Sequence, residues 1–175
     1  MTKHKVLSMS IAAAMLLPYG AAQAATAGPA NFTVSATVAN FCTISAANVP
    51  FGSVNAGAAA TNTANTVTLT CNKGATVSSV ALNNGSSASG TQKRMTNGTD
   101  FLNYAIDAPT GAAFNTCPAA GAGPEWNATN TIAATSLFSA SGGPKQINLC
   151  ASIPSGQFPS AGLYTDTVQV TATYN

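Results

Sequence analysis

The side chains that could do chemistry in this 175-residue chain are few and do not form a catalytic set. His4 is the only histidine, and it lies in an N-terminal segment that we expect to be removed. Without histidine, the chain cannot run a Ser-His-Asp or Cys-His mechanism or supply imidazole ligands to zinc. No two carboxylates share a recognisable motif. We therefore predict neither an enzyme nor a metal or cofactor site. The acidic residues are Asp100, Asp107, Glu125 and Asp166.

Four cysteines are the other reactive groups, and they fit an oxidising compartment. They are Cys42, Cys71, Cys117 and Cys150, with no CxxC spacing that would indicate a metal site. Three pairings are possible. We favour Cys42–Cys71 with Cys117–Cys150, because each bridge then closes a local loop of about 30 residues and contributes roughly 3.5 kcal/mol in the chain-entropy model.

The N-terminus has the features of an export signal at residues 1–24. Two lysines precede an apolar run that is too short to span a membrane, and Ala22-Gln23-Ala24 gives a small-x-small cleavage site. After cleavage, four basic and four acidic residues remain, so the net charge is zero. A chain without a basic stripe is not expected to bind nucleic acid, and no second apolar run predicts a membrane span.

Beyond the leader, apolar residues alternate with Thr, Ser and Asn at a period of two. One apolar and one polar face is typical of an antiparallel sandwich strand, and turn signals such as Asn84-Gly85 and Asn97-Gly98 separate the runs. No segment has a convincing helical period. We predict an all-β chain with a single immunoglobulin-like β-sandwich. Its apolar positions are Val67, Leu69 and Cys71; Leu102, Tyr104 and Ile106; Ile147, Leu149, Ala151 and Ile153; and, in the longest strand, Val168, Val170, Ala172 and Tyr174.

Several short segments follow one another in a recognisable order. They are FTVSATV at 32–38, FCTISA at 41–46, VPFG at 49–52, VTLTC at 67–71, KRM at 93–95, LNY at 102–104, IPSG at 153–156 and GLYTDTV at 162–168. In this order they resemble spore coat protein U domains over essentially the whole chain after the leader, 42–175 being the domain itself. That domain is shared with subunits of archaic chaperone–usher pili. The resemblance implies a secreted, disulfide-bonded, incomplete immunoglobulin-like fold that lacks its last edge strand.

The C-terminal strand has the features that the resemblance implies for pairing with another molecule. In chaperone–usher subunits a glycine lies fourteen places from the end and an aromatic residue is penultimate, and here these are Gly162 and Tyr174. A final strand without a neighbour leaves an open edge and an uncovered groove. We expect a strand of a periplasmic chaperone, and later of a neighbouring subunit, to pair there by β-strand addition, beside Gly162, Val168, Val170, Ala172 and Tyr174.

Residues 25–41 are a candidate donor strand for such a groove. The segment contains Gly28 and Pro29 near its start. Four alternate apolar side chains follow in register, at Phe32, Val34, Ala36 and Val38. The alternative is that 32–38 is the first strand of the chain's own sandwich. A tip subunit would lack a donor, so this segment favours a shaft or adapter position.

Three further features have interpretations of their own. We expect Trp126 to pack in the core or a loop rather than bind a ligand, Lys93-Arg94 to lie in a solvated hairpin, and Asp166 to make a turn or edge hydrogen bond. The function that the sequence favours is a structural subunit of a surface pilus, exported through the periplasm by a chaperone and an outer-membrane usher and serving adhesion or biofilm formation. The alternative is a coat or tip protein of the same domain family that does not polymerise.

Overall fold

The structure is a computed structural model that describes residues 23–175, so the leader expected at 1–24 lies almost wholly outside the described residues. The chain divides after Thr37 into two units. In the first unit, residues 23–37 contain neither helix nor strand, and every side chain is exposed. Residues 38–41, at the start of the second unit, have the same character.

The second unit is built from short β-strands and one turn of 3₁₀ helix, as the period-two pattern predicts. The helical turn found in the described residues is η1 (Thr135–Leu137). The strands are β1 (Cys42–Ala46), β2 (Ala60–Asn62), β3 (Thr66–Cys71), β4 (Val77–Leu82), β5 (Arg94–Thr96), β6 (Phe101–Asn103), β7 (Ala105–Asp107), β8 (Gly143–Asn148), β9 (Cys150–Ile153) and β10 (Val170–Tyr174).

One layer of the sandwich joins two antiparallel ladders. β3 lies between β1 and β8, and β9 lies between β2 and β7. β2 is followed directly by β3, and β8 is followed directly by β9. The two ladders are therefore built from the same two chain segments and follow one another along them. The first disulfide joins Cys42 to Cys71, which are direct partners in the β1–β3 register.

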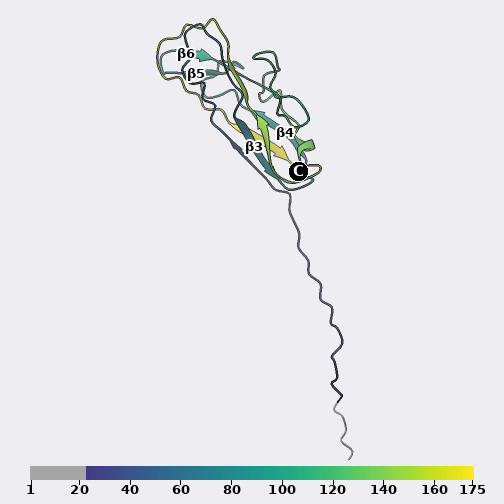
Figure 1. The fold of residues 1–175 in the computed structure, drawn as a ribbon. Coiled ribbons are helices and arrows are strands. Elements are labelled where there is room, and N and C mark those ends of the chain that lie inside the picture. The colour runs from purple at the N-terminus through teal and green to yellow at the C-terminus, as the bar shows by residue number, and fades with distance from the viewer. Residues whose placement is uncertain (1–22) are drawn as a thin grey trace, which may run out of the picture. The chain divides into compact units, whose positions relative to one another are not determined.

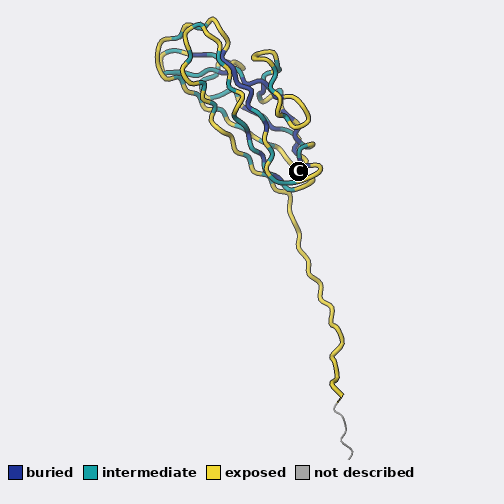
Figure 2. The backbone as a smooth tube through the Cα atoms, viewed as in Figure 1, coloured by how far each residue is buried: buried dark blue, intermediate teal, exposed yellow. Residues whose placement is uncertain are grey.

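The other layer pairs β4 with β10, antiparallel, and extends to the β5–β6 hairpin through a bridge between Thr96 and Thr165. Figure 1 shows β5 and β6 at the end of this unit remote from the C-terminus. Figure 2 shows that the buried residues run through the middle of the unit, between the two layers. The all-β, disulfide-bonded sandwich is therefore confirmed, and no helix in the described part of the chain is long and apolar enough to cross a membrane.

The inward positions that alternation predicts form the core. Buried members include Val67 and Leu69 on β3, Leu102 on β6, Ile106 on β7 and Ile147 on β8. On β3 the burial pattern alternates strictly between half-buried threonine and buried apolar residues. All four residues of β9 are buried, and the loop that carries Cys117 is bonded to this strand at Cys150.

The prediction that the C-terminal strand is the longest is wrong. β10 has five residues, one fewer than β3, β4 or β8. Residues before it lie beside the chain that follows β4, but side chains replace part of the backbone ladder. The N–H of Gln169 donates to Oδ1 of Asn83 at 2.9 Å, and the N–H of Thr167 donates to Oγ of Ser86 at 3.4 Å.

Candidate functional site

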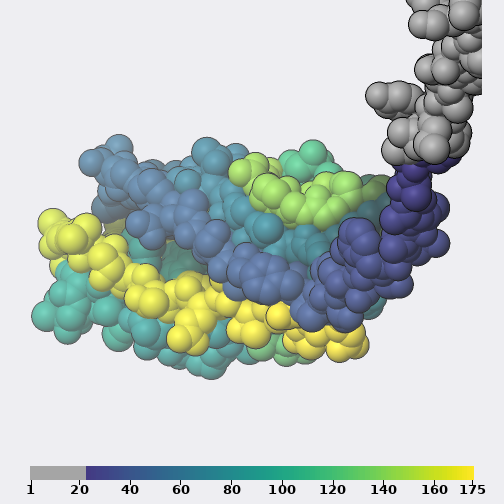
Figure 3. Space-filling model, turned by 90° about the horizontal axis from the view of Figure 1, so that it is seen from below, coloured from purple at the N-terminus to yellow at the C-terminus, as the bar shows by residue number. Residues whose placement is uncertain are grey.

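A large apolar groove of about 1160 Å³ opens beside the C-terminal segment of the second unit. Its walls are residues 46–56 on one side and residues 157–170 on the other, and its floor includes Leu82, Leu102, Ile106 and Leu149. These four floor residues are buried members of the core. Figure 3 shows the hollow between a blue segment and the yellow C-terminal segment, with teal residues at its bottom. A stretch of the core is therefore left without a covering strand.

The C-terminal wall presents an unpaired backbone edge to this groove. Thr165 donates its N–H to the carbonyl of Thr96 at 3.0 Å. The N–H groups of Thr167 and Gln169 point to the same side of the wall, where they donate to the side chains of Ser86 and Asn83. The intervening residues Asp166 and Val168 have no backbone hydrogen bond to any described residue. In an extended strand, alternate residues address opposite neighbours. The groove side of this wall therefore offers free N–H and C=O groups to an additional strand.

The opposite wall is irregular, and only part of its backbone is unpaired. Val49, Phe51 and Val54 pack against the core, and their N–H groups have no hydrogen-bond acceptor among the described residues. Pro50 has no N–H to offer, and Gly52 adopts a positive φ of 69°. The regular edge that a new strand could extend is therefore the C-terminal wall.

The accepting residues expected from the sequence are only partly lined up along the groove. Gly162, Val168 and Val170 line it. Ala172 is half-buried and packs against the core beyond the groove, and Tyr174, 38% exposed, lies at the end of β10. Among the wall residues that the prediction omitted are Tyr164 and Asp166. Their even numbering, in phase with Val168 and Val170, was the available signal.

Asp166 is held in the groove wall by hydrogen bonds. Its Oδ2 accepts from the hydroxyl of Tyr104 at 2.7 Å, and its Oδ1 accepts from Oγ of Ser86 at 2.7 Å and the N–H of Ser87 at 3.0 Å. Burial opposes ionisation, but these hydrogen bonds outweigh it, so the pKa of Asp166 lies below its ordinary value. Burial and the bond to Asp166 raise the pKa of Tyr104. The expected edge hydrogen bond of Asp166 is confirmed.

Gly85 makes room for this carboxylate. It has a positive φ of 90°, and a Cβ atom at this position would collide with Oδ2 of Asp166. The Asn84-Gly85 turn that the sequence indicates therefore serves the groove wall as well as the chain reversal.

A family model of the Spore Coat Protein U domain matches residues 29–171. The chain belongs to this family. Among solved structures it is similar to the CsuC-CsuE chaperone-tip adhesion subunit pre-assembly complex from archaic chaperone-usher Csu pili of Acinetobacter baumannii. The identity is 25% and the TM-score 0.44, and the match covers 78% of this chain and 40% of that chain. A comparison with curated proteins found no match.

The candidate donor residues of this spore coat U protein lie in the part of the chain without strands. Phe32, Val34 and Val38 are 86%, 83% and 81% exposed, and Ala36 is also exposed. The alternative, that 32–38 forms the first strand of the chain's own sandwich, does not agree with the structure, in which the first strand is β1. Large apolar side chains in water are costly unless a partner covers them.

The prediction for Lys93 is wrong, whereas that for Trp126 is confirmed. Both side chains are fully buried. Nζ of Lys93 lies 3.1 Å from Oε1 of Glu125 and donates to the carbonyl of Trp126 at 3.0 Å, so the charge is paired and hydrogen-bonded inside the domain. Nε1 of Trp126 donates to the carbonyl of Val80 at 2.8 Å. Arg94 does lie near the surface, over the ring of Phe101 at 4.0 Å.

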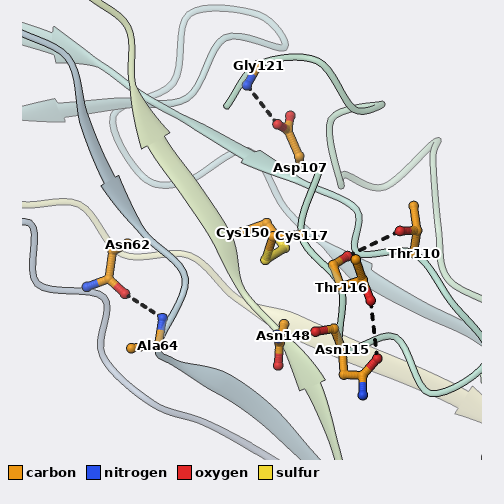
Figure 4. Close-up of a disulfide and its surroundings, with 10 residues drawn as sticks. All are labelled: Asn62, Ala64, Asp107, Thr110, Asn115, Thr116, Cys117, Gly121, Asn148 and Cys150. Carbon is orange, nitrogen blue, oxygen red and sulfur yellow. Dashed lines mark hydrogen bonds between the residues drawn. A yellow bond between two sulfur atoms is a disulfide. The ribbon is translucent and has the colours of Figure 1, made fainter. Parts of the chain in front are cut away.

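The second disulfide, Cys117–Cys150, confirms the predicted pairing and ties a long loop to β9. Figure 4 shows Asp107 near it, with a carboxylate that accepts from the N–H of Gly121 at 2.9 Å. The described residues contain no group of three His, Cys, Asp or Glu side chains that could hold a metal ion. In this region of the spore coat U domain, the disulfide and the hydrogen bond of Asp107 serve to anchor the loop.

Proposed function

We propose that this protein is a structural subunit of a chaperone–usher type surface pilus and that its groove accepts a donor strand from a neighbouring subunit. The observation that carries the proposal is the groove itself, because an apolar floor beside an unpaired backbone edge has the chemistry that an added β-strand satisfies. Membership of the spore coat U family supports it.

The N-terminal segment of a second copy supplies the donor in this proposal. Residues 32–38 are seven residues that span six steps, about 20 Å in extended chain, and residues 164–170 span the same six steps. Four alternate side chains on the donor therefore meet four alternate positions on the wall. A chain that holds both a donor and a groove can polymerise, which favours a shaft or adapter subunit over a tip.

The remaining parts of the proposal follow from an exposed groove. Until a neighbour arrives, a periplasmic chaperone fills the groove with a strand of its own, and an outer-membrane usher mediates the exchange. The mature protein is exported to the cell surface, where it serves adhesion or biofilm formation in a structural rather than a catalytic role. A non-polymerising coat or tip protein is the second candidate, and it is the better account if the groove never accepts a strand.

The test is to fuse residues 31–38 after Asn175 through a flexible linker. The fused donor should fill the groove of its own chain, so we expect a soluble monomer with a melting temperature clearly above that of the unfused mature chain, which should aggregate or polymerise. The control is the same fusion with Val34→Asp in the added segment, which should behave like the unfused chain. An unfused chain that is monomeric and equally heat-stable would contradict the proposal.

A further inference from the structure

The exposed large apolar side chains of the described residues gather at three places. Three are in the N-terminal segment that serves as the proposed donor. The others lie in the second unit, at its two ends: Phe41 (58% exposed) and Tyr174 (38%) at one end, and Phe101 (46%), Phe158 (80%) and Leu163 (82%) at the other. We call these the Phe41 end and the Leu163 end.

The hydrogen bonds place each residue at its end. Phe41 is held to the turn after β3, where its N–H donates to Oδ1 of Asn72 at 3.0 Å and its carbonyl accepts from the Asn72 N–H at 3.2 Å. The C-terminus lies nearby, since Asn175 is bonded to Thr76.

At the opposite end, Phe158 and Leu163 belong to the loop before the C-terminal wall. The N–H of Ser160 in this loop donates to Oδ2 of Asp100 at 2.8 Å, and Asp100 directly precedes Phe101. Figure 1 shows the β5–β6 hairpin at this end, away from the C-terminus.

The orientation of the donor decides which ends meet. The C-terminal wall is the regular edge, and it already pairs antiparallel with β4 on its other side. An antiparallel donor, the more stable choice on such an edge, places Val38 near Tyr164, at the Leu163 end. A parallel donor would bring two Phe41 ends together, where the acceptor's own N-terminal segment begins.

The linker between donor and domain is too short to hold two domains apart. Val38 is the last donor side chain and Phe41 is already fixed to Asn72, so three peptide units separate them, about 10–11 Å when extended. The Phe41 end of the donor copy must then lie against the Leu163 end of the acceptor.

We propose that successive copies of this chain make a second, head-to-tail contact in which the Phe41 end of one copy packs on Phe158 and Leu163 of the next. This contact rests on the proposed function, and it fixes the angle between neighbouring domains. The repeat is heterologous and does not close, as in a filament.

Two experiments on the full mature chain test the contact. Phe158→Ser changes a side chain that is not among those lining the groove, so the donor and the groove should stay intact and ladders of polymer should persist on unheated denaturing gels. The fibres should bend more, with a persistence length at least twofold shorter in electron micrographs. The Phe158 side chain is 80% exposed, so the fold should be unchanged.

The second experiment is cross-linking between copies. Phe41→Cys with Leu163→Cys should give at least tenfold more disulfide-linked copies than Ser45→Cys with Leu163→Cys, because Ser45 is an exposed residue of β1 further into the domain. Peptide mapping checks that both native disulfides are retained. Ladders with equal cross-linking in the two pairs, or with unchanged stiffness in the serine variant, would overturn the contact alone. Absence of ladders from the unaltered chain would overturn the proposed function, and the contact with it.

Discussion

A single charge placed on the apolar face of the N-terminal segment should block assembly, whereas the same charge one residue later should not. Val34 alternates with Ser35, so in an extended donor their side chains point to opposite faces. Val34→Asp puts a carboxylate into the groove, and Ser35→Asp leaves it in water. Both residues are exposed in the structure, so neither change should alter the folding of the subunit itself.

The size of the effect follows from what the groove contains. Removing a buried valine loses about 2 kcal/mol of apolar burial, and a buried charge without a partner costs about 3 kcal/mol or more. The described residues that line the groove include no Lys or Arg to pair with the new charge, and Asp166 already contributes a carboxylate. A total of about 5 kcal/mol weakens strand exchange by more than a thousandfold. Ser35→Asp should stay within about 0.5 kcal/mol, which is roughly a factor of two.

The assay is polymerisation of the purified mature chain. The fraction in ladders on unheated denaturing gels and the elution volume in size-exclusion chromatography follow assembly over time. We expect the Ser35→Asp variant to polymerise like the unaltered chain and the Val34→Asp variant to remain without ladders. Equal ladder formation by the two variants would show that residues 32–38 are not the donor.

Two further predictions concern the polar residues behind the groove, measured on the monomeric fusion. Lys93→Ala leaves the partner groups at Glu125 and Trp126 unsatisfied and should lower the free energy of unfolding in urea by about 3 kcal/mol. Lys73→Ala, at an exposed residue, should cost less than about 1 kcal/mol, and similar losses for the two would contradict the buried pairing. Because the pKa of Asp166 is lower in the folded than in the unfolded state, its stabilising contribution is complete above about pH 4 and is lost as the pH falls through the folded value. Asp166→Asn should therefore flatten the decline in stability below pH 4, and an unchanged slope would refute this role.

Much of the fold can be predicted from the sequence, because the alternation of residues along a strand shows which of its two faces is apolar. The period-two runs at 67–71 and 102–106 predicted which residues are buried, and the spacing of the cysteines favoured the two local bridges that the structure contains. The same alternation marked 32–38 as a strand-like segment. Strand alternation and the length of the loop between two cysteines can both be read directly from the sequence.

The open edge was decided only by the tertiary structure. Whether a strand lacks a neighbour depends on how all the other strands pair, and the groove joins a wall at 46–56, a wall at 157–170 and a floor from residues between them. For the same reason the burial of Lys93 could not be predicted. Lys93 lies beside Arg94 in sequence, but its partner is Glu125, 32 residues away. Tertiary pairing also made β10 shorter than expected, because side chains of Asn83 and Ser86 replaced backbone partners. A sequence pattern shows which face of a strand is apolar, and only the assembled sheets show which edge is left unpaired.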